Sequence, residues 1–384
     1  MQKTDDNIIN LFEQSNPGFH KIKLTESMKL KRGGSLANPH LAYETWGKLS
    51  SSKDNVIVIL TGLSASSHVA SSSSNSSAGW WEGMVGIDKA IDTDKYYVIC
   101  INSLGSCFGS TGPASINEIT KEPYRLTFPE LSIDDMALAT KLLLDKLDIN
   151  SIHTLIGPSM GGMHALALIV QNTNLVKNFI AISTASQSLP YAIAIRSLQR
   201  EVIRKDPLWK NGYYLPESPP HNGVRIARKL GMISYRSADE WAQRFGRKKS
   251  TKAEITQNTF GIENTNFEFE IESYLEHLAI KFQDVFDANS YLYLSRAIDW
   301  FDIADYGASS DKVLGQTGIA NALILGVKSD TLFPISQQKE IAESLSMGST
   351  KVTYKSLDCI QGHDSFLVDI ETFSKEIKCF LDNL

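Results

Sequence analysis

The chain has 384 residues, of which 42% are apolar and 21% are charged, so it can form one large α/β domain with an insertion or two ordinary domains. The formal net charge of -5 gives no broad basic surface, which argues against nucleic acid as a partner. The four cysteines lie far apart without a CxxC pair, so we expect free thiols and neither a disulfide scaffold nor a metal site.

The amino-terminal region is polar and acidic, and the mixed composition of residues 1–35 predicts loops. No apolar run reaches the length of a signal-peptide core or a membrane span, so the sequence predicts a cytoplasmic protein with no membrane partner. Residues 41–47 alternate between apolar and polar, which predicts a half-buried strand of the kind found in an edge hairpin.

Short continuous apolar runs predict the buried strands of a parallel sheet. They lie at residues 56–60, 96–101, 152–156, 179–182 and 322–327, and a further strand is predicted at 352–357. Segments of helical periodicity alternate with them at 132–147, 163–170, 336–346 and 370–381. This alternation predicts an α/β fold whose mostly parallel sheet is covered by helices on both faces.

Three other stretches have the composition of loops. Residues 64–77 are rich in serine and predict a flexible surface loop. The glycine-rich residues 102–113 lack the lysine of a P-loop, so we expect a tight, ordered loop beside the active site rather than a phosphate cradle. The basic run Arg247-Lys248-Lys249 is interpreted as a solvated loop.

The pattern changes between residues 186 and 315, where mixed segments of helical period are separated by prolines. Helices are predicted at 192–203, 224–230, 238–245, 267–286 and 291–301. We therefore expect a core formed by residues 1–185 and 316–384, interrupted by a helical lid insertion at 186–315.

Ser159 lies in the sequence Gly157-Pro158-Ser159-Met160-Gly161, between a predicted strand and a predicted helix. A GxSxG motif alone recurs by chance, but this context is typical of a nucleophile elbow. Only glycine tolerates the crowding two residues before and after the serine in such a turn. The sequence therefore predicts Ser159 as a nucleophile; the alternative is a glycine-rich turn with a bystander serine.

A serine hydroxyl needs a histidine to take its proton and an acid to orient the imidazole. Asp330 and His363 each follow a predicted strand, and the chain order Ser, Asp, His is that of an α/β-hydrolase fold. The alternative acids Asp299, Asp302 and Asp305 lie in a helical pattern. Among the other histidines, His68 and His277 lack an acid partner at a strand end, and His20, His40, His153 and His164 fit packing or surface roles.

The tetrahedral intermediate of acyl transfer needs two backbone N–H donors. In this fold they come from the residue after the nucleophile and from the loop after an early strand. Met160 and Leu63 are the candidates for this oxyanion hole.

With these residues the chain resembles the homoserine O-acetyltransferase family of α/β-hydrolase-fold acyltransferases, which also contains homoserine and serine O-succinyltransferases. The resemblance extends over most of the chain. It rests on Thr61-Gly62-Leu63 with His68-Val69-Ala70, Gly79-Trp80-Trp81, Asn102-Ser103-Leu104-Gly105 with Gly109-Ser110-Thr111-Gly112-Pro113, Pro123-Tyr124-Arg125 and Gly157–Met163. Two departures are Glu118, where relatives often carry proline, and the serine run at 71–77.

The resemblance implies that Ser159 is acylated by an acyl-CoA and that an amino-acid hydroxyl then attacks the acyl-enzyme. It places the family's substrate-binding arginine on Arg228 and its acidic substrate ligand on Asp364, which suits the carboxylate and ammonium groups of an amino acid. Arg196 stands where acetyl-transferring relatives carry a neutral residue. It therefore favours succinyl-CoA, although a solvated helix arginine remains the alternative.

The loop Ser64, Ala65, Ser66 and Ser67 resembles the serine branch, although one methylene separates serine from homoserine in a pocket by only about 1–3 kcal/mol. The resemblance thus implies a serine O-succinyltransferase of cysteine biosynthesis, with homoserine O-succinyl or O-acetyl transfer in methionine biosynthesis as the alternative. It implies a homodimer, and succinyl-CoA or acetyl-CoA as a co-substrate with no separate cofactor. An esterase and a non-catalytic ligand-binding relative are the remaining alternatives.

Overall fold

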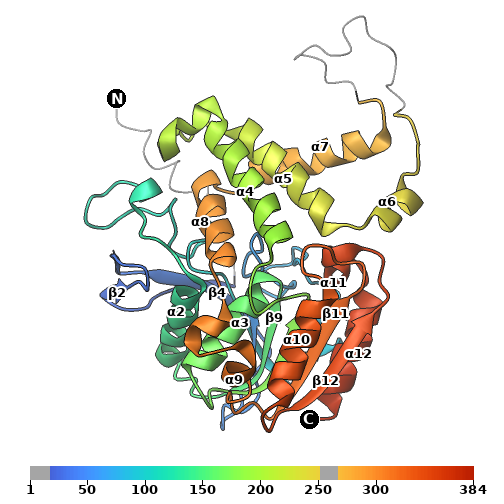
Figure 1. Ribbon diagram of the computed structural model, residues 1–384. Helices are drawn as coiled ribbons and strands as arrows, with labels where there is room; N and C mark the ends of the chain where they lie inside the picture. Colours follow the sequence, from blue (N-terminus) through green and yellow to red (C-terminus); the bar gives the residue numbers. More distant parts are fainter. Residues whose placement is uncertain (1–17, 251–266) are drawn as a thin grey trace, which may run out of the picture.

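The computed structural model describes residues 18–250 and 267–384 (Figure 1). The first part of the predicted amino-terminal loop and a stretch of the predicted insertion lie outside the described residues. The core is built around one eight-stranded sheet with the order β1-β4-β8-β5-β9-β10-β11-β12. Its strands are β1 (Phe19–Lys23), β4 (His40–Trp46), β5 (Val56–Leu60), β8 (Tyr97–Ile101), β9 (Ile152–Pro158), β10 (Val176–Ile182), β11 (Asn321–Val327) and β12 (Lys351–Leu357).

The strands from β8 to β12 run parallel, whereas β1 and β4 are antiparallel at one edge. Two short pairs lie outside this sheet: β2 (Ser27–Lys29) with β3 (Ser35–Ala37), and β6 (Val85–Gly86) with β7 (Ile91–Asp92). The parallel strands β5, β8, β9, β10 and β11 contain the predicted apolar runs, because strands buried on both faces carry no polar alternation. The predicted strand at 352–357 is β12, a more polar and less buried strand at the sheet edge.

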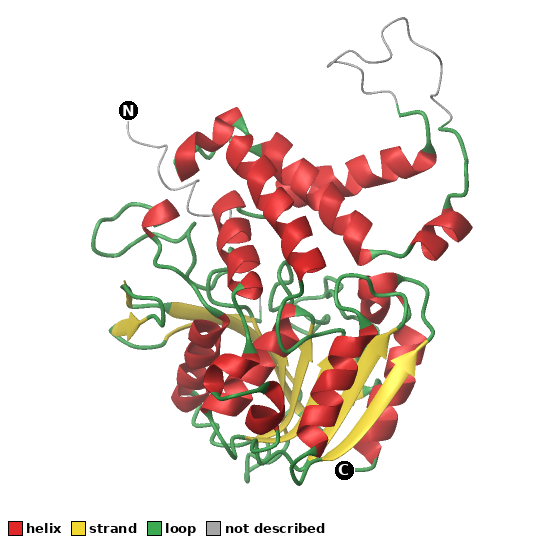
Figure 2. Cartoon of the chain, viewed as in Figure 1, coloured by secondary structure: helices red, strands yellow, loops and turns green. Residues whose placement is uncertain are grey.

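Strand β5 shows how the two faces of the sheet are covered. All five of its residues are buried, and alternate ones belong to different cores. Val58 packs with α2 (Ile133–Lys146) and α3 (Met160–Gln171) on one face, and Ile57 packs with α12 (Ile370–Asp382) on the other. Helix α10 (Ile335–Ser346) lies over β11 and β12. Figure 2 shows these helices flanking the sheet.

Above the carboxyl ends of the parallel strands stands a group of helices from the segment between β10 and β11, here called the lid helices (Figure 1). They are α4 (Pro190–Lys205), α5 (His221–Tyr235), α6 (Ala238–Arg244), α7 (Glu270–Gln283) and α8 (Ala288–Asp299). The last part of the predicted insertion does not belong to this group. Its η3 (Ile303–Tyr306) and α9 (Ser310–Leu314) contact α3 and α10 of the core.

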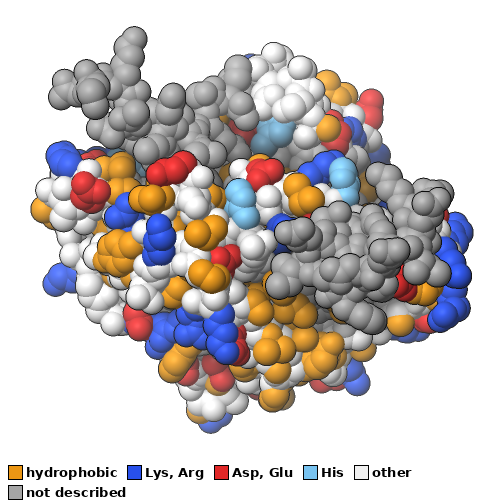
Figure 3. Space-filling model, turned by 90° about the horizontal axis from the view of Figure 1, so that it is seen from above, with side chains coloured by type: hydrophobic (Ala, Val, Ile, Leu, Met, Phe, Trp, Pro, Cys, Tyr) orange, Lys and Arg blue, Asp and Glu red, His pale blue; other side chains and the backbone are white. Residues whose placement is uncertain are grey.

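Remaining short helices are η1 (Arg125–Thr127), η2 (Pro207–Gly212), η4 (Gly362–Asp364) and α11 (Ser365–Val368). None of the helices in the described part of the chain has the length and apolar character needed to cross a membrane. On the described part of the face seen from above, acidic and basic side chains are scattered among apolar ones (Figure 3).

Two predictions from composition are wrong. The described part of residues 1–35 is not simply loop, because β1 to β3 start there. β1 pairs antiparallel with β4 at the edge of the sheet, where the edge hairpin was expected for residues 41–47. These strands are too short and too polar to give a clear signal. The serine-rich stretch is also not a wholly exposed loop, since Ser67, His68, Val69 and Ala70 are buried.

Candidate active site

Ser159 lies at the sharp turn between β9 and α3, with backbone angles φ 55° and ψ -125°. Residues other than glycine rarely adopt these backbone angles, so contacts with the surrounding structure must hold Ser159 in this conformation. The Ser159 N–H donates to the Ile182 carbonyl (2.9 Å), and Thr184 Oγ1 donates to the Ser159 carbonyl (2.7 Å). A Cβ on Gly161 would lie 2.2 Å from the Leu60 carbonyl oxygen, so this turn requires glycine there.

The predicted base and acid meet Ser159 in a continuous hydrogen-bonded chain. His363 Nε2 lies 2.8 Å from Ser159 Oγ, and His363 Nδ1 lies 2.8 Å from Asp330 Oδ2. The other carboxylate oxygen of Asp330 accepts the N–H groups of Leu332 and Phe333, both at 2.9 Å. The backbone therefore orients the acid, and the acid orients the imidazole. This is the arrangement that activates a serine hydroxyl as a nucleophile.

Electrostatics fit the role of His363 as a proton acceptor. Burial alone would lower the pKa of His363, but the charge of Asp330 and its hydrogen bond to Nδ1 raise this pKa above the ordinary value. A more basic imidazole takes the serine proton more readily, provided that it is neutral at the working pH.

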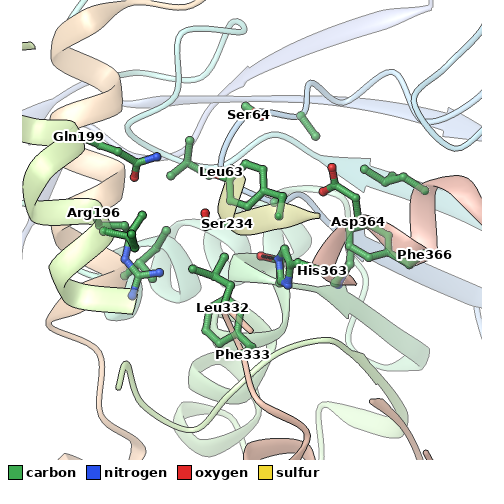
Figure 4. Close-up of a pocket in the computed structure, with 18 of the residues that line it drawn as sticks. Leu63, Ser64, Arg196, Gln199, Ser234, Leu332, Phe333, His363, Asp364 and Phe366 are labelled. Atoms are coloured by element: carbon green, nitrogen blue, oxygen red, sulfur yellow. Dashed lines mark hydrogen bonds between the residues drawn. The ribbon is translucent and has the colours of Figure 1, made fainter. Parts of the chain in front are cut away.

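A pocket of about 210 Å³ opens at this chain of residues (Figure 4). The core contributes the loop after β5, Trp80, Phe333, Asp364 and Phe366, and the lid helices contribute side chains of α4, α5 and α8. The lid side chains at the pocket are Ile195, Arg196, Gln199, Ser234, Tyr235 and Ile298. The site is thus enclosed between the edge of the sheet and the lid helices.

Leu63 and Met160 lie at the positions expected of an oxyanion hole. Leu63 lines the pocket in the loop after β5, and Met160 is the first residue of α3. Among the described residues, neither backbone N–H donates to a protein acceptor. Because the first N–H groups of a helix have no partner within it, that of Met160 can donate to a substrate oxygen.

Arg196 lines the pocket, as a donor-binding arginine would, but it already has an anionic partner. Its Nε lies 2.5 Å from Asp299 Oδ1, and its Nη2 donates to Ser188 Oγ (2.7 Å). The second oxygen of Asp299 lies 2.6 Å from Nη1 of Arg200. Asp299 therefore belongs to this cluster and not to the triad. The three charged side chains together carry one net positive charge.

Arg228 and Asp364 take different positions around the pocket. Asp364 lines it, and burial raises the pKa of this carboxyl although the charges of His363, Arg236 and Arg228 oppose the rise. Arg228 does not line the empty pocket. Its guanidinium lies over the ring of Phe282 (4.5 Å) and near Tyr235, and its buried Nε has no hydrogen-bond partner within the described structure.

Only part of the loop expected to select the acceptor reaches the pocket. Ser64 and Ala65 line the pocket, whereas Ser66 and Ser67 do not. Ser67 is buried and donates to Glu44 on β4, and the adjacent His68 pairs with the same carboxylate. His68 therefore has an acid partner that the sequence did not indicate, although this partner lies within a strand and not at a strand end. Glu44 lies in the middle of an alternating strand, 24 positions away, so no motif connects the two residues in the sequence.

A parallel sheet with a serine elbow and a Ser-His-Asp site beneath a lid defines the α/β-hydrolase fold. Comparison with known proteins agrees: residues 55–364 match the family model described as alpha/beta hydrolase fold. The chain is 50% identical over 370 residues to a serine O-succinyltransferase of Xylella fastidiosa strain M23, covering 96% of this chain and 98% of the relative. The chain thus belongs to the α/β-hydrolase-fold family and groups there with these acyltransferases.

Solved structures of a named acetyltransferase and a named esterase show the same fold. The homoserine O-acetyltransferase from Bacillus anthracis superposes with a TM-score of 0.85 at 27% identity, covering 96% of this chain and 98% of that one. Esterase E22 superposes with a TM-score of 0.83, also at 27% identity, covering 94% of this chain and 99% of that one. Transfer and hydrolysis therefore both occur on this architecture.

Proposed function

We propose that this protein is a serine O-succinyltransferase, which transfers the succinyl group of succinyl-CoA to the hydroxyl of L-serine for cysteine biosynthesis. The observation that carries this proposal is the hydrogen-bonded chain Ser159, His363 and Asp330, which opens into a pocket lined by a buried arginine. The similarity over nearly the whole chain to a relative named serine O-succinyltransferase supports it.

The first half-reaction acylates Ser159. Its Oγ attacks the thioester carbonyl while His363 Nε2 takes the hydroxyl proton, and the Leu63 and Met160 N–H groups stabilise the oxyanion. The C–S bond then breaks, and His363 returns the proton to the sulfur of the departing CoA. In the second half-reaction the serine hydroxyl attacks the acyl-enzyme and gives its proton to His363. Collapse of the intermediate releases O-succinylserine and returns the proton to Ser159 Oγ.

The cluster of Arg196, Arg200 and Asp299 supplies donor selectivity in this proposal. Its net positive charge suits the distal carboxylate of a succinyl group, which an acetyl group lacks. Because Asp299 orients Arg196 from one side, the guanidinium is held in place before the donor arrives.

The amino-acid acceptor is assigned to Arg228 and Asp364. The unpartnered Nε of Arg228 is a buried donor that a substrate carboxylate would satisfy, and a carboxylate beside His363 suits an ammonium group. An acceptor held between them would present its hydroxyl toward the base.

The test compares acetyl-CoA and succinyl-CoA, each with serine, homoserine or water, by the release of free CoA thiol. We expect fastest release with succinyl-CoA and serine. Release that does not depend on any amino acid would indicate an esterase-type hydrolase, and faster turnover with homoserine would overturn the proposed acceptor. Faster turnover with acetyl-CoA would overturn the proposed donor.

One substitution tests the donor assignment. Arg196→Asn should lower kcat/KM for succinyl-CoA by roughly ten- to a hundredfold more than for acetyl-CoA, since a hydrogen bond to a charged group contributes about 1.5–3 kcal/mol. Arg204→Asn, on the exposed side of the same helix, is the matched control. Equal losses for both donors would remove the proposed role of Arg196.

We also infer a cytoplasmic homodimer that associates through the lid helices. Neighbouring helices α4, α5 and α7 carry exposed apolar side chains, among them Leu198, Ile226, Ile233 and Ile280. Burial of such side chains in a symmetric interface would stabilise a dimer. Light scattering should give twice the 42.5 kDa of a single chain, and a mass of one chain would contradict the dimer.

A further inference from the structure

A second buried ion pair lies outside the catalytic residues. Glu44 on β4 is 2% exposed, and His68 in the loop after β5 is 9% exposed. His68 Nδ1 lies 2.8 Å from Glu44 Oε2, and Ser67 Oγ donates to Glu44 Oε1 (3.1 Å). Burying a carboxylate costs free energy unless the charge is paired. We therefore ask which part of the structure the ion pair holds in place.

The partners of His68 determine its protonation state. Nδ1 lies 2.8 Å from a carboxylate oxygen of Glu44, and Nε2 lies 2.9 Å from the Ser77 carbonyl oxygen and 3.2 Å from its hydroxyl. Two acceptors facing the two nitrogens favour the imidazolium form, which donates from both. Burial alone would lower the pKa of His68, but its hydrogen bonds to Glu44 and Ser77 and the charges of Glu44 and Glu82 raise it. The cation thus links β4 to the serine-rich stretch.

The same segment forms one wall of the active-site pocket. Ser64 and Ala65 line the pocket directly before Ser67 and His68 in the chain. The carbonyl of Ala65 accepts from Asn102 Nδ2 (3.1 Å), and that of Ser66 accepts from Trp80 Nε1 (3.0 Å). Among the described residues, the ion pair between His68 and Glu44 is the only one that joins this segment of the chain to the sheet.

We propose that the Glu44–His68 ion pair is a positioning device that fixes the wall Leu63–Ala65 and thereby sets the selectivity between serine and homoserine. The inference rests on the proposed function, because it concerns the amino acid that attacks the acyl-enzyme. Neither residue touches the pocket, so both act through the loop. A wall free to move by a fraction of a bond length accommodates the extra methylene of homoserine, which a fixed wall excludes.

Glu44→Gln tests this idea because it keeps the shape of the side chain and removes the charge. We expect the ratio of kcat/KM for serine to that for homoserine to fall about fivefold or more, since one methylene is worth about 1–3 kcal/mol. His68→Gln should give a similar fall, and the double variant should add little to either single one because both break the same pair. An unchanged ratio, or effects that add independently, would overturn the proposal.

Glu82→Gln is the matched control. Glu82 accepts hydrogen bonds from Ser71 and Gly79 in the same serine-rich stretch, but it does not contact the wall. Its charge raises the pKa of His68 less than the hydrogen bond and the charge of Glu44 do, and it forms no hydrogen bond with His68. Its removal should lower the melting temperature without changing the ratio. If Glu82→Gln changed the acceptor ratio as much as Glu44→Gln, the effect would come from general loosening of the stretch, and the proposal would fail.

Two further measurements separate this proposal from the proposed function. If the wild-type protein transferred succinyl to neither amino acid, the proposed function would fail. The pair would still be tested by hydrolysis of p-nitrophenyl acetate, which Glu44→Gln should slow about tenfold by displacing the Leu63 N–H from the oxyanion. If Glu44→Gln did not fold, Ser67→Ala removes only one contact to Glu44 and should still lower the acceptor ratio; an unchanged ratio would contradict the role of the pair.

Discussion

Two carboxylates act on the imidazole of His363. Asp330 holds Nδ1, and Asp364, the next residue in the chain, also raises the pKa of His363 through its charge. Since His363 must be neutral to accept the Ser159 proton, a raised pKa means that activity is lost below a higher pH than for an ordinary histidine. The charge of Asp364 therefore contributes to the position of the acid limb of the pH profile.

We predict that Asp364→Asn moves this acid limb toward lower pH, because loss of the negative charge lowers the pKa of His363. The limb should be measured as kcat/KM for p-nitrophenyl acetate, since this substrate does not need Asp364 as a ligand. Asp358→Asn, an exposed carboxylate nearby in the chain, serves as the control and should leave the limb in place. A limb that stays at the wild-type pH in Asp364→Asn would rule out this charge effect.

Substitution of the nucleophile Ser159 should abolish most of the activity. Ser159→Ala should reduce acyl transfer by roughly 10⁴- to 10⁶-fold, as expected when the nucleophile of a triad is removed. The fold should survive, because the hydrogen-bond partner of Ser159 Oγ within residues 18–250 and 267–384 is His363 alone, and Ser159 is not part of either apolar core. Intact protein mass after incubation with succinyl-CoA should show an added acyl group on the wild type and none on the variant.

The close packing of α3 against the ends of β5 and β9 depends on two glycines. A Cβ at Gly161 would meet the Leu60 carbonyl oxygen at 2.2 Å, and one at Gly157 would meet the Gly161 carbonyl oxygen at 2.4 Å. These obstacles are backbone atoms, which cannot rotate away. The absence of a side chain at Gly157 and Gly161 therefore allows α3 to approach the sheet closely, and this approach sets the position of Ser159.

Gly161→Ala should destabilise the protein by about 1–3 kcal/mol or more, the usual cost of overpacking. Chemical denaturation should show the loss as a lower midpoint. Gly62→Ala is a suitable control for stability, because a Cβ there meets nothing within 4 Å and its φ is not positive. Equal midpoints for Gly161→Ala and the wild type would show that the backbone can shift to admit the methyl group.

Sequence patterns predict best those elements that depend on local composition or on burial by any apolar neighbour. Buried parallel strands are continuous apolar runs in the sequence, and β5, β8, β9, β10 and β11 were predictable for that reason. Chain order was enough to select Asp330 and His363. Ion pairs between distant elements left no such signal: Arg196 and Asp299 are 103 positions apart, and each reads locally as a residue on an amphipathic helix. The same holds for Glu44 and His68.

At the scale of the whole molecule, the fold does not decide between transfer and hydrolysis. Structures titled homoserine O-acetyltransferase and esterase superpose on this chain almost equally well. We expect the difference to depend on how well the pocket excludes water from the acyl-enzyme, and the lid helices cover this pocket. Tyr235 at the end of α5 is central to this, since it lines the pocket and its ring lies 5.9 Å from that of His363.

Tyr235→Ala should therefore increase the share of acyl-enzyme that is hydrolysed. We expect thiol release from succinyl-CoA without any amino acid to rise several-fold relative to release with serine, because water gains access to the ester. Tyr191→Ala is the control, since Tyr191 on α4 is 55% exposed and does not line the pocket. A variant that hydrolysed no more than the wild type would show that Tyr235 does not keep water out.

The triad joins parts of the chain that a ribosome makes at very different times. Ser159 and His363 are 204 positions apart, and the lid helices lie between them in the sequence. A growing chain can form the elbow once β9, α3 and β10 have emerged, but its serine has no base until β11 and β12 have joined the sheet. The nucleophile is therefore inert during synthesis, and it becomes reactive only after the helices that cover it are already in place.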